Sequence, residues 1–386
     1  MTDLPLQCPL PQPIPSSEAV LDDLSPLLAY LPTNQPIAQK LVFPRGTVMS
    51  DGRLDLCKQQ LGVTGCELVT AALTHNHTIV SLLLGTNGMG DRGAAAVAKL
   101  IGRNDHLGVI YLGCNAISAT GTAAIADALT VNETVHSLWL KRNPIGIDGA
   151  YALAEMLHQN RTIHTLDLVH THLEDAGFAA ILDVLAHRNR TVKRLYLGGN
   201  QLDANHASLL ATLLQQNPSL TTLSLNVNQL GDSGLEHLSV GLQQNCTLTE
   251  LGLASNGISD VGCCTLISAL QNHPTLRRLD LGYSPSTNAL SAQPNGIGNQ
   301  GAKAIAQFLA QNPPLVWLDL SNHLIQESGK TALRNALATN HTLQFLHLDG
   351  DYDRQLESLL QRNQRQHSTD EWQVPPEIAL IQSVYR

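Results

Sequence analysis

The stretch VHSLWLKRNPIGIDG, residues 135–149, carries the pattern that decides the fold. A similar stretch, IHTLDLVHTHLEDAG, occupies residues 163–177, and two others precede it at residues 79–93 and 107–121. Further copies begin at Val192, Leu220, Leu248, Leu276, Leu315 and Leu343, and a degraded copy begins at Arg53. From Ile79 onward, successive copies lie 28 residues apart, except for one step of 29 and one of 39. This regular self-similarity predicts a repeat protein.

Each copy has two parts that differ in hydrophobic periodicity. In the first part, apolar residues alternate with others, as at Leu138 and Leu140, which is the pattern of a short strand. The second part begins near a glycine such as Gly149 and places Leu153 and Leu157 on one face of a helix. Neither part can bury its apolar face alone, so we expect stacked copies to share one core between a parallel sheet and a helix layer.

A polar residue separates the strand from the helix in each copy. The column consists of Asn87, Asn115, Asn143, Thr171, Asn200, Asn228, Asn256, Asn295 and His323. Backbone groups lose their strand partners where the chain leaves the sheet, and an asparagine side chain can both donate to them and accept from them. We therefore predict a structural role for this column.

A second asparagine recurs where each helix leads into the next strand. It lies in Asn-x-Thr triplets that begin at Asn76, Asn132, Asn160, Asn189, Asn245 and Asn340. Because asparagine adopts left-handed backbone conformations readily, we expect these residues to end the helices in that conformation.

The repeats resemble the leucine-rich repeat, LxxLxLxxNxL, over about residues 53–350. Their 28-residue length and their GaxxLaxaL helices are similar to the ribonuclease-inhibitor-like subtype. The resemblance implies an α/β horseshoe solenoid with a parallel β-sheet on the concave face and α-helices on the convex face. It also implies that the chain binds other proteins. A minority of the subtype, the Ran-GTPase-activating kind, stimulates GTP hydrolysis.

The two ends depart from the repeat and predict three parts of the chain. Residues 1–50 are rich in proline and are expected to form an N-terminal segment and cap, with a short helix at residues 17–31. Residues 51–350 form the solenoid, and residues 351–386 form a C-terminal capping helix and tail. Caps are expected because the terminal layers of a solenoid otherwise expose their core.

Two segments leave alternatives open. The 39-residue step contains about eleven extra residues, Ser284 to Pro294, which form either a functional loop or a tolerated insertion. The apolar C-terminal tail either folds back on the last repeat or docks on a partner.

Composition excludes several classes of function. The net charge of −9 argues against nucleic-acid binding, which needs Lys and Arg to neutralise phosphates. No apolar run approaches the length of about 18 residues that a membrane helix needs. The N-terminus shows no secretory signal, and the seven scattered cysteines indicate buried free thiols in a reducing compartment. We therefore predict a cytoplasmic protein that binds neither nucleic acid nor membrane.

Side chains that alternate with the core leucines should point onto the concave face. One group there combines aromatic residues with cations, as interface hot spots do. This candidate partner-binding patch consists of Tyr111, Trp139, Lys141, Arg142, Asp167, His170, His172, Arg194 and Tyr196. A second, weaker group consists of Arg278, Asp280, Tyr283, Trp317, Asp319, Phe345 and His347. If the first patch binds a partner, Trp139→Ala should weaken capture and leave thermal unfolding nearly unchanged.

Catalytic and metal-binding patterns are missing from the sequence. His136 and His164 occupy equivalent positions, but no residue clearly completes a zinc site, so we predict no metal and no cofactor. No GxSxG, HExxH or GxxxxGK[ST] motif occurs. The main prediction is a non-catalytic scaffold or inhibitor that binds a protein partner through its concave face. The alternative is a GTPase-activating protein of the Ran-GTPase-activating kind, for which Arg142 would supply the cation.

Overall fold

The computed structural model describes residues 17–349 and 354–366. The described residues belong to two compact units, one ending at Val192 and the other beginning at Lys193, which we call unit 1 and unit 2. The first sixteen residues and the apolar C-terminal tail, on which parts of the domain prediction rest, lie outside the described residues.

Unit 1 begins with a helix and a pair of antiparallel strands and continues as strand–helix repeats. Its first elements are α1 (Ser17–Tyr30), η1 (Leu31–Thr33), β1 (Leu41–Val42) and β2 (Thr47–Val48). Its repeat strands are β3 (Arg53–Asp55), β4 (Ser81–Leu83), β5 (Val109–Tyr111), β6 (Ser137–Trp139) and β7 (Thr165–Asp167). Its repeat helices are α2 (Gly62–Leu73), α3 (Gly90–Ile101), α4 (Ala119–Thr130), α5 (Gly146–Gln159) and α6 (Glu174–His187). From β3 to β7 the strands pair in parallel.

Unit 2 contains strand–helix repeats followed by a final helix. Its strands are β8 (Arg194–Tyr196), β9 (Thr222–Ser224), β10 (Glu250–Gly252), β11 (Arg278–Asp280), β12 (Trp317–Leu320) and β13 (Phe345–Leu348). Its helices are α7 (Ala204–Gln216), α8 (Gly231–Leu242), α9 (Asp260–Leu270), α10 (Asn299–Leu309), α11 (Glu327–Thr339) and α12 (Arg354–Gln366). All these strands pair in parallel with their neighbours in the sequence.

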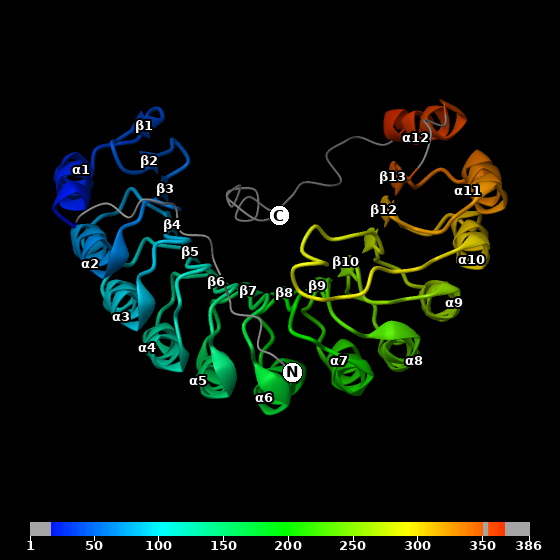
Figure 1. Cartoon of the computed structure of the whole chain (residues 1–386), viewed down its shortest axis with the longest axis horizontal. Helices are drawn as coiled ribbons and strands as arrows, with labels where there is room; N and C mark the ends of the chain where they lie inside the picture. Colours follow the sequence, from blue (N-terminus) through cyan, green and yellow to red (C-terminus); the bar gives the residue numbers. More distant parts are fainter. Residues whose placement is uncertain (1–16, 350–353, 367–386) are drawn as a thin grey trace. The chain divides into compact units, whose positions relative to one another are not determined.

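Within each unit the strands form one layer and the helices form the other (Figure 1). The core between them consists of the repeated leucines, such as Leu138 and Leu166, which pair in register and are fully buried. Glycine near each helix start lets neighbouring helices approach, since a Cβ on Gly177 would lie 2.6 Å from the Cβ of Ala150. The predicted α/β solenoid is therefore confirmed. Within the described parts of the chain, no helix has the length and apolar character needed to span a bilayer.

The first asparagine column has the structural role that the sequence predicts. The Asn143 amide nitrogen donates to the carbonyl oxygens of Leu112 (3.0 Å) and Leu140 (2.8 Å). Its side-chain oxygen accepts from the backbone N–H groups of Asn115 (2.9 Å) and Ile117 (3.1 Å). This one buried side chain therefore joins two successive repeats with four hydrogen bonds.

At the end of this column His323 replaces asparagine and keeps its hydrogen bonds to the backbone. The Nδ1 atom of His323 accepts from the Ile297 N–H (3.3 Å), and its Nε2 atom lies 2.9 Å from the Leu281 carbonyl oxygen. The ring therefore contacts one donor and one acceptor, as the asparagines do.

The second asparagine column also joins successive repeats, but not through a left-handed backbone. Asn160 is extended, with φ −65° and ψ 139°. Its amide nitrogen donates to the Leu129 carbonyl oxygen (2.7 Å), and its side-chain oxygen accepts from the N–H groups of Thr162 (2.8 Å) and Ile163 (2.9 Å). None of the six asparagines of this column has a positive φ, so the prediction of left-handed helix ends was wrong. The side chain rather than the backbone satisfies the helix carbonyls.

Polar side chains close both ends of the repeat array. Near the N-terminal end, Asn76 donates to the carbonyl oxygen of Leu31 (2.7 Å), directly after α1. Near the C-terminal end, Asn363 and Gln364 of α12 donate to the carbonyl oxygens of Leu343 and Gln344, both at 2.7 Å. These bonds tie η1 and α12 to the neighbouring repeats and satisfy backbone carbonyls there.

The inserted segment, Ser284 to Pro294, contacts the preceding repeat, and the cysteines differ in their exposure. Within the insertion, the Thr287 hydroxyl lies 2.6 Å from the Ser255 hydroxyl, and the Gln293 carbonyl accepts from the Gly257 N–H (3.0 Å), so the segment packs on the preceding repeat. Cys66 and Cys263 are buried free thiols, as predicted, and Cys57 is also buried. The prediction was wrong for the other described cysteines, because Cys246 and Cys264 are exposed and Cys114 is disulfide-bonded. The cytoplasmic location stays a prediction.

Candidate functional site

The aromatic residues of the first candidate patch lie on adjacent strands of unit 1. Trp139 pairs with Tyr111 on one side and with Asp167 on the other. However, Tyr111 is 2%, Trp139 6% and Asp167 3% exposed. The structure thus brings the three side chains together in the predicted register but buries them.

Burial sets the electrostatics of these residues. It raises the pKa of Asp167 to about 6, with the Lys141 ammonium acting in the opposite direction. It also raises the pKa of the Tyr111 hydroxyl. The Asp167 carboxylate accepts from the Val169 N–H (2.9 Å), and Asp280 and Asp319 accept in the same way from the residue two positions later. Asp167 therefore has a structural role at the end of its strand.

The basic residues of the first patch in unit 1 lie just after the strands, where the chain turns toward the helices. Lys141, Arg142, His170 and His172 are all half-buried. The His170 and His172 rings lie 5.1 Å apart, and burial, followed by the positive charges of His172 and Arg142, lowers the pKa of His170 to about 4. His170 is therefore neutral at neutral pH.

The remaining two residues of the first patch, Arg194 and Tyr196, lie on β8 and so belong to unit 2. Both are half-buried. Burial lowers the pKa of Arg194, and the negative charge of Glu250 counters that effect. The charges of Arg194 and Glu250 therefore attract each other within unit 2.

The second candidate group forms a connected cluster on the strands of unit 2. The Arg278 guanidinium carbon lies 3.6 Å from the centroid of the Trp317 ring, which is a close cation–π contact. The His347 ring meets the same tryptophan edge-on, with the centroids 5.3 Å apart. His347 Nδ1 also lies 3.1 Å from an oxygen of Asp319. One aromatic ring is therefore held between a cation and a histidine that itself contacts a carboxylate.

This cluster is accessible. Trp317 pairs in register with Arg278 and Phe345, and Asp319 pairs with His347 on the same strands. Arg278 and Trp317 are half-buried, whereas the Phe345 side chain is among the exposed large apolar residues at 38% exposure. We call Arg278, Trp317, Asp319, Phe345 and His347 the unit 2 patch.

Other members of the second group surround the unit 2 patch. Asp280 lies on β11, and burial raises its pKa. Its carboxylate accepts from the Asn226 amide (3.2 Å), which fixes its orientation. Tyr283 is half-buried, and its backbone N–H donates to the Ser321 hydroxyl (3.4 Å).

The structure offers no metal centre in its described part. The His136 and His164 rings lie 6.4 Å apart. Among the described residues, no group of three or more His, Cys, Asp or Glu side chains could hold a metal ion. The GTPase-activating alternative, for which Arg142 would supply the cation, stays a prediction.

Comparison with known proteins agrees with the fold. Residues 75–98, 159–182, 216–239 and 244–266 match the family model for the leucine-rich repeat. Together with the strand–helix repeats, these matches show that the chain contains leucine-rich repeats. The ribonuclease-inhibitor-like subtype stays a prediction. None of the curated proteins matches the sequence significantly.

Two solved structures are similar to part of the chain. One, described as leiomodin-1 actin-binding site 2, is 16% identical and has a TM-score of 0.33, with 48% of this chain and 88% of that chain covered. The other is the C-terminal domain of a Caenorhabditis elegans tropomodulin, at 11% identity and a TM-score of 0.32, with 49% of this chain and 94% of that chain covered. At these values neither likeness bears on function.

Proposed function

We propose that the protein is a non-catalytic scaffold or inhibitor that binds a protein partner through the strand faces of its repeats. The observation that carries this proposal is the unit 2 patch, where Arg278 stacks on Trp317 beside the exposed Phe345. Interface hot spots are enriched in Trp, Tyr and Arg because these side chains combine large area with planar hydrogen bonding. A partner that covers this patch would bury an aromatic and cationic centre within a polar rim.

Unit 1 and, separately, β8 of unit 2 contribute further proposed contacts. The half-buried Lys141, Arg142, His170 and His172 of unit 1, and Arg194 and Tyr196 of unit 2, would meet polar or acidic groups of the partner. The buried Tyr111, Trp139 and Asp167 would support the unit 1 residues from beneath without touching the partner.

The double variant Arg278→Ala/Trp317→Ala tests the proposal. It removes both members of the cation–π pair, and truncating hot-spot residues typically costs at least about 2 kcal/mol of binding, or roughly thirtyfold in affinity. We expect the double variant to retain at least tenfold less of the specific partner than the unchanged protein in quantitative affinity purification. Calorimetric titration of the purified partner then gives the loss of affinity directly.

A matched control is available on the helix layer. Arg92 and Glu67 form an exposed ion pair with 3.2 Å between Nη2 and Oε1. The double variant Arg92→Ala/Glu67→Ala removes an equal number of side chains away from the strands and should retain the partner fully. If the two double variants retain the same partner equally well, the unit 2 patch is not the binding surface.

A further inference from the structure

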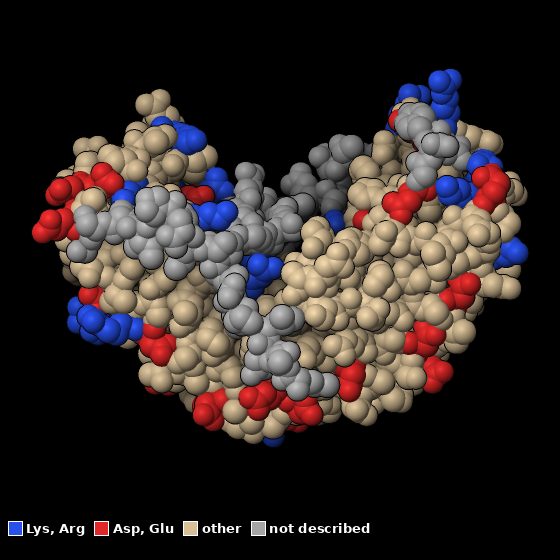
Figure 2. Space-filling view, in the orientation of Figure 1, with Lys and Arg blue, Asp and Glu red and all other residues tan. Residues whose placement is uncertain are grey.

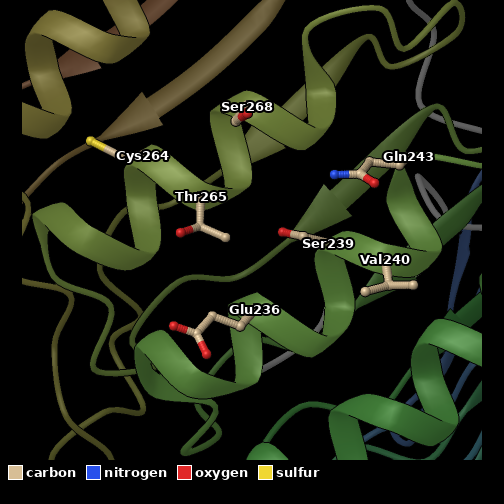
Figure 3. Close-up of a pocket in the computed structure, with 7 residues that line it drawn as sticks. All are labelled: Glu236, Ser239, Val240, Gln243, Cys264, Thr265 and Ser268. Carbon is tan, nitrogen blue, oxygen red and sulfur yellow. The ribbon is translucent and has the colours of Figure 1, made fainter.

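Two neighbouring hollows lie between α8 and α9 on the helix layer of unit 2. The first is lined by polar side chains from both helices, with Glu236, Ser239 and Gln243 facing Thr265 and Ser268 (Figure 3). The second shares Gln243 and Ser268 with the first and lies where the two helices end. It has a volume of about 400 Å³, and we call it the helix-end pocket. Its other lining residues include Leu242, Asn245, Cys246, Asn272 and His273.

His273 breaks the second asparagine column at this pocket. It follows Asn245 by 28 residues and therefore takes the place of the next asparagine. Its side chain is 6% exposed, and neither ring nitrogen has a hydrogen-bond partner among the described residues. In intact repeats the asparagine amide donates to two carbonyls of the preceding repeat, as Asn160 does to Leu129 (2.7 Å) and Asn132 (3.2 Å). The corresponding carbonyls here, those of Leu242 and Asn245, receive no hydrogen bond from His273.

The chain itself shows which group fits beside such helix-end carbonyls. The guanidinium of Arg161 donates to the carbonyl oxygens of Leu157 (3.5 Å) and Asn160 (2.9 Å) at the end of α5. Arg190 donates to Ala186 (3.0 Å) at the end of α6. A guanidinium suits this position because it offers several donors in a fixed plane and because the end of a helix carries partial negative charge.

The helix-end pocket has the same acceptors but no arginine of its own. Leu242, Asn245 and Cys246 occupy the positions of Leu157, Asn160 and Arg161 in the sequence repeat. All three line the pocket, so a short cysteine stands where the guanidinium lies on α5.

The charge around the pocket also favours a cation. No lysine or arginine lines either hollow, and Glu236 lines the first. Acidic side chains are also spread over the helix side of unit 2 (Figure 2). Burial lowers the pKa of His273, so its ring is neutral at neutral pH and one ring nitrogen can accept a hydrogen bond.

We propose that the helix-end pocket binds the guanidinium of an arginine side chain from a partner protein. The guanidinium would donate to the carbonyls of Leu242 and Asn245 and to a ring nitrogen of His273. The polar groove between α8 and α9 would receive the polypeptide next to that arginine. This site lies on the helix layer, so it is independent of the strand-face binding proposed above.

The site is tested by titrating the full chain with Nα-acetyl-arginine amide and recording TROSY NMR spectra. We expect saturable shifts of the backbone amides at residues 242–246 and 272–276. Two compounds serve as comparisons. Nα-acetyl-lysine amide has the same charge as the arginine compound, and Nα-acetyl-citrulline amide has nearly the same shape without the charge. Both should bind at least tenfold more weakly, because neither presents a planar cation with several donors.

Two variants supply donors to these carbonyls from within the chain and should remain folded. Cys246→Arg supplies an internal guanidinium, as Arg161 does, and His273→Asn restores the asparagine of the column. Each should weaken Nα-acetyl-arginine amide binding at least tenfold and should not lower the melting temperature. The matched control Cys246→Ser should bind as the unchanged protein does. Equal binding of arginine and citrulline amides, or unchanged binding by Cys246→Arg, would overturn the proposal.

Discussion

Replacing Asn143 by alanine should lower the free energy of unfolding by about 4 kcal/mol. The substitution removes four hydrogen bonds at a side chain with 0% exposure. It leaves the carbonyls of Leu112 and Leu140 and the N–H groups of Asn115 and Ile117 without this partner. Each buried polar group that loses its partner costs about 1–3 kcal/mol, and neighbouring losses are not fully additive. Urea denaturation followed by circular dichroism gives the difference.

The control for this prediction is Asn205→Ala. Asn205 is exposed on α7, so its replacement should change the free energy of unfolding by no more than about 0.5 kcal/mol. Equal stability of the Asn143 and Asn205 variants would show that the column does not hold successive repeats together.

The second large effect concerns Trp139. Because its side chain is only 6% exposed, Trp139→Ala should lower the free energy of unfolding by about 3 kcal/mol, in the range for truncating a buried aromatic residue. The sequence alone predicts the opposite, a variant that unfolds almost normally but loses its partner. The same denaturation experiment distinguishes the two.

Trp317→Ala provides the comparison. Trp317 is half-buried on the unit 2 strands, so its replacement should cost less stability than that of Trp139 and should affect partner binding more. If Trp139→Ala unfolds as the unchanged protein does, Trp139 is available to a partner, and the first patch rather than the unit 2 patch becomes the main candidate.

The repeat made most of the fold predictable. A 28-residue period fixes which residues share a register position, so the pairing of Tyr111 with Trp139 and of Trp139 with Asp167 followed from counting. The role of Asn143 followed from the chemistry of its side chain at a turn. These features depend on periodicity and local hydrogen bonding, both of which are present in the sequence.

Burial of Tyr111, Trp139 and Asp167 could not be predicted in the same way. Alternation gives the direction of a side chain but not how much of it remains accessible. Tyr111 and Trp139 are large neighbours on adjacent strands and are buried, whereas Trp317 has Arg278 across its ring face and an exposed Phe345 on the next strand.

The break at His273 could have been found from the sequence. It lies 28 residues after Asn245, where the column requires an asparagine. Whether the histidine fulfils the role of the asparagine depends on the geometry, since His323 does so in the first column and His273 does not in the second.

Photo-crosslinking tests the central claim, that a partner binds the strand face of unit 2, most directly. In one variant p-benzoylphenylalanine replaces Phe345. In the other it replaces Val131, which directly follows α4 on the helix layer and is 81% exposed. Both variants are irradiated with the partner obtained by affinity purification. We expect a crosslinked product from position 345 and none from position 131. A crosslink from position 131 with none from position 345 would contradict the claim.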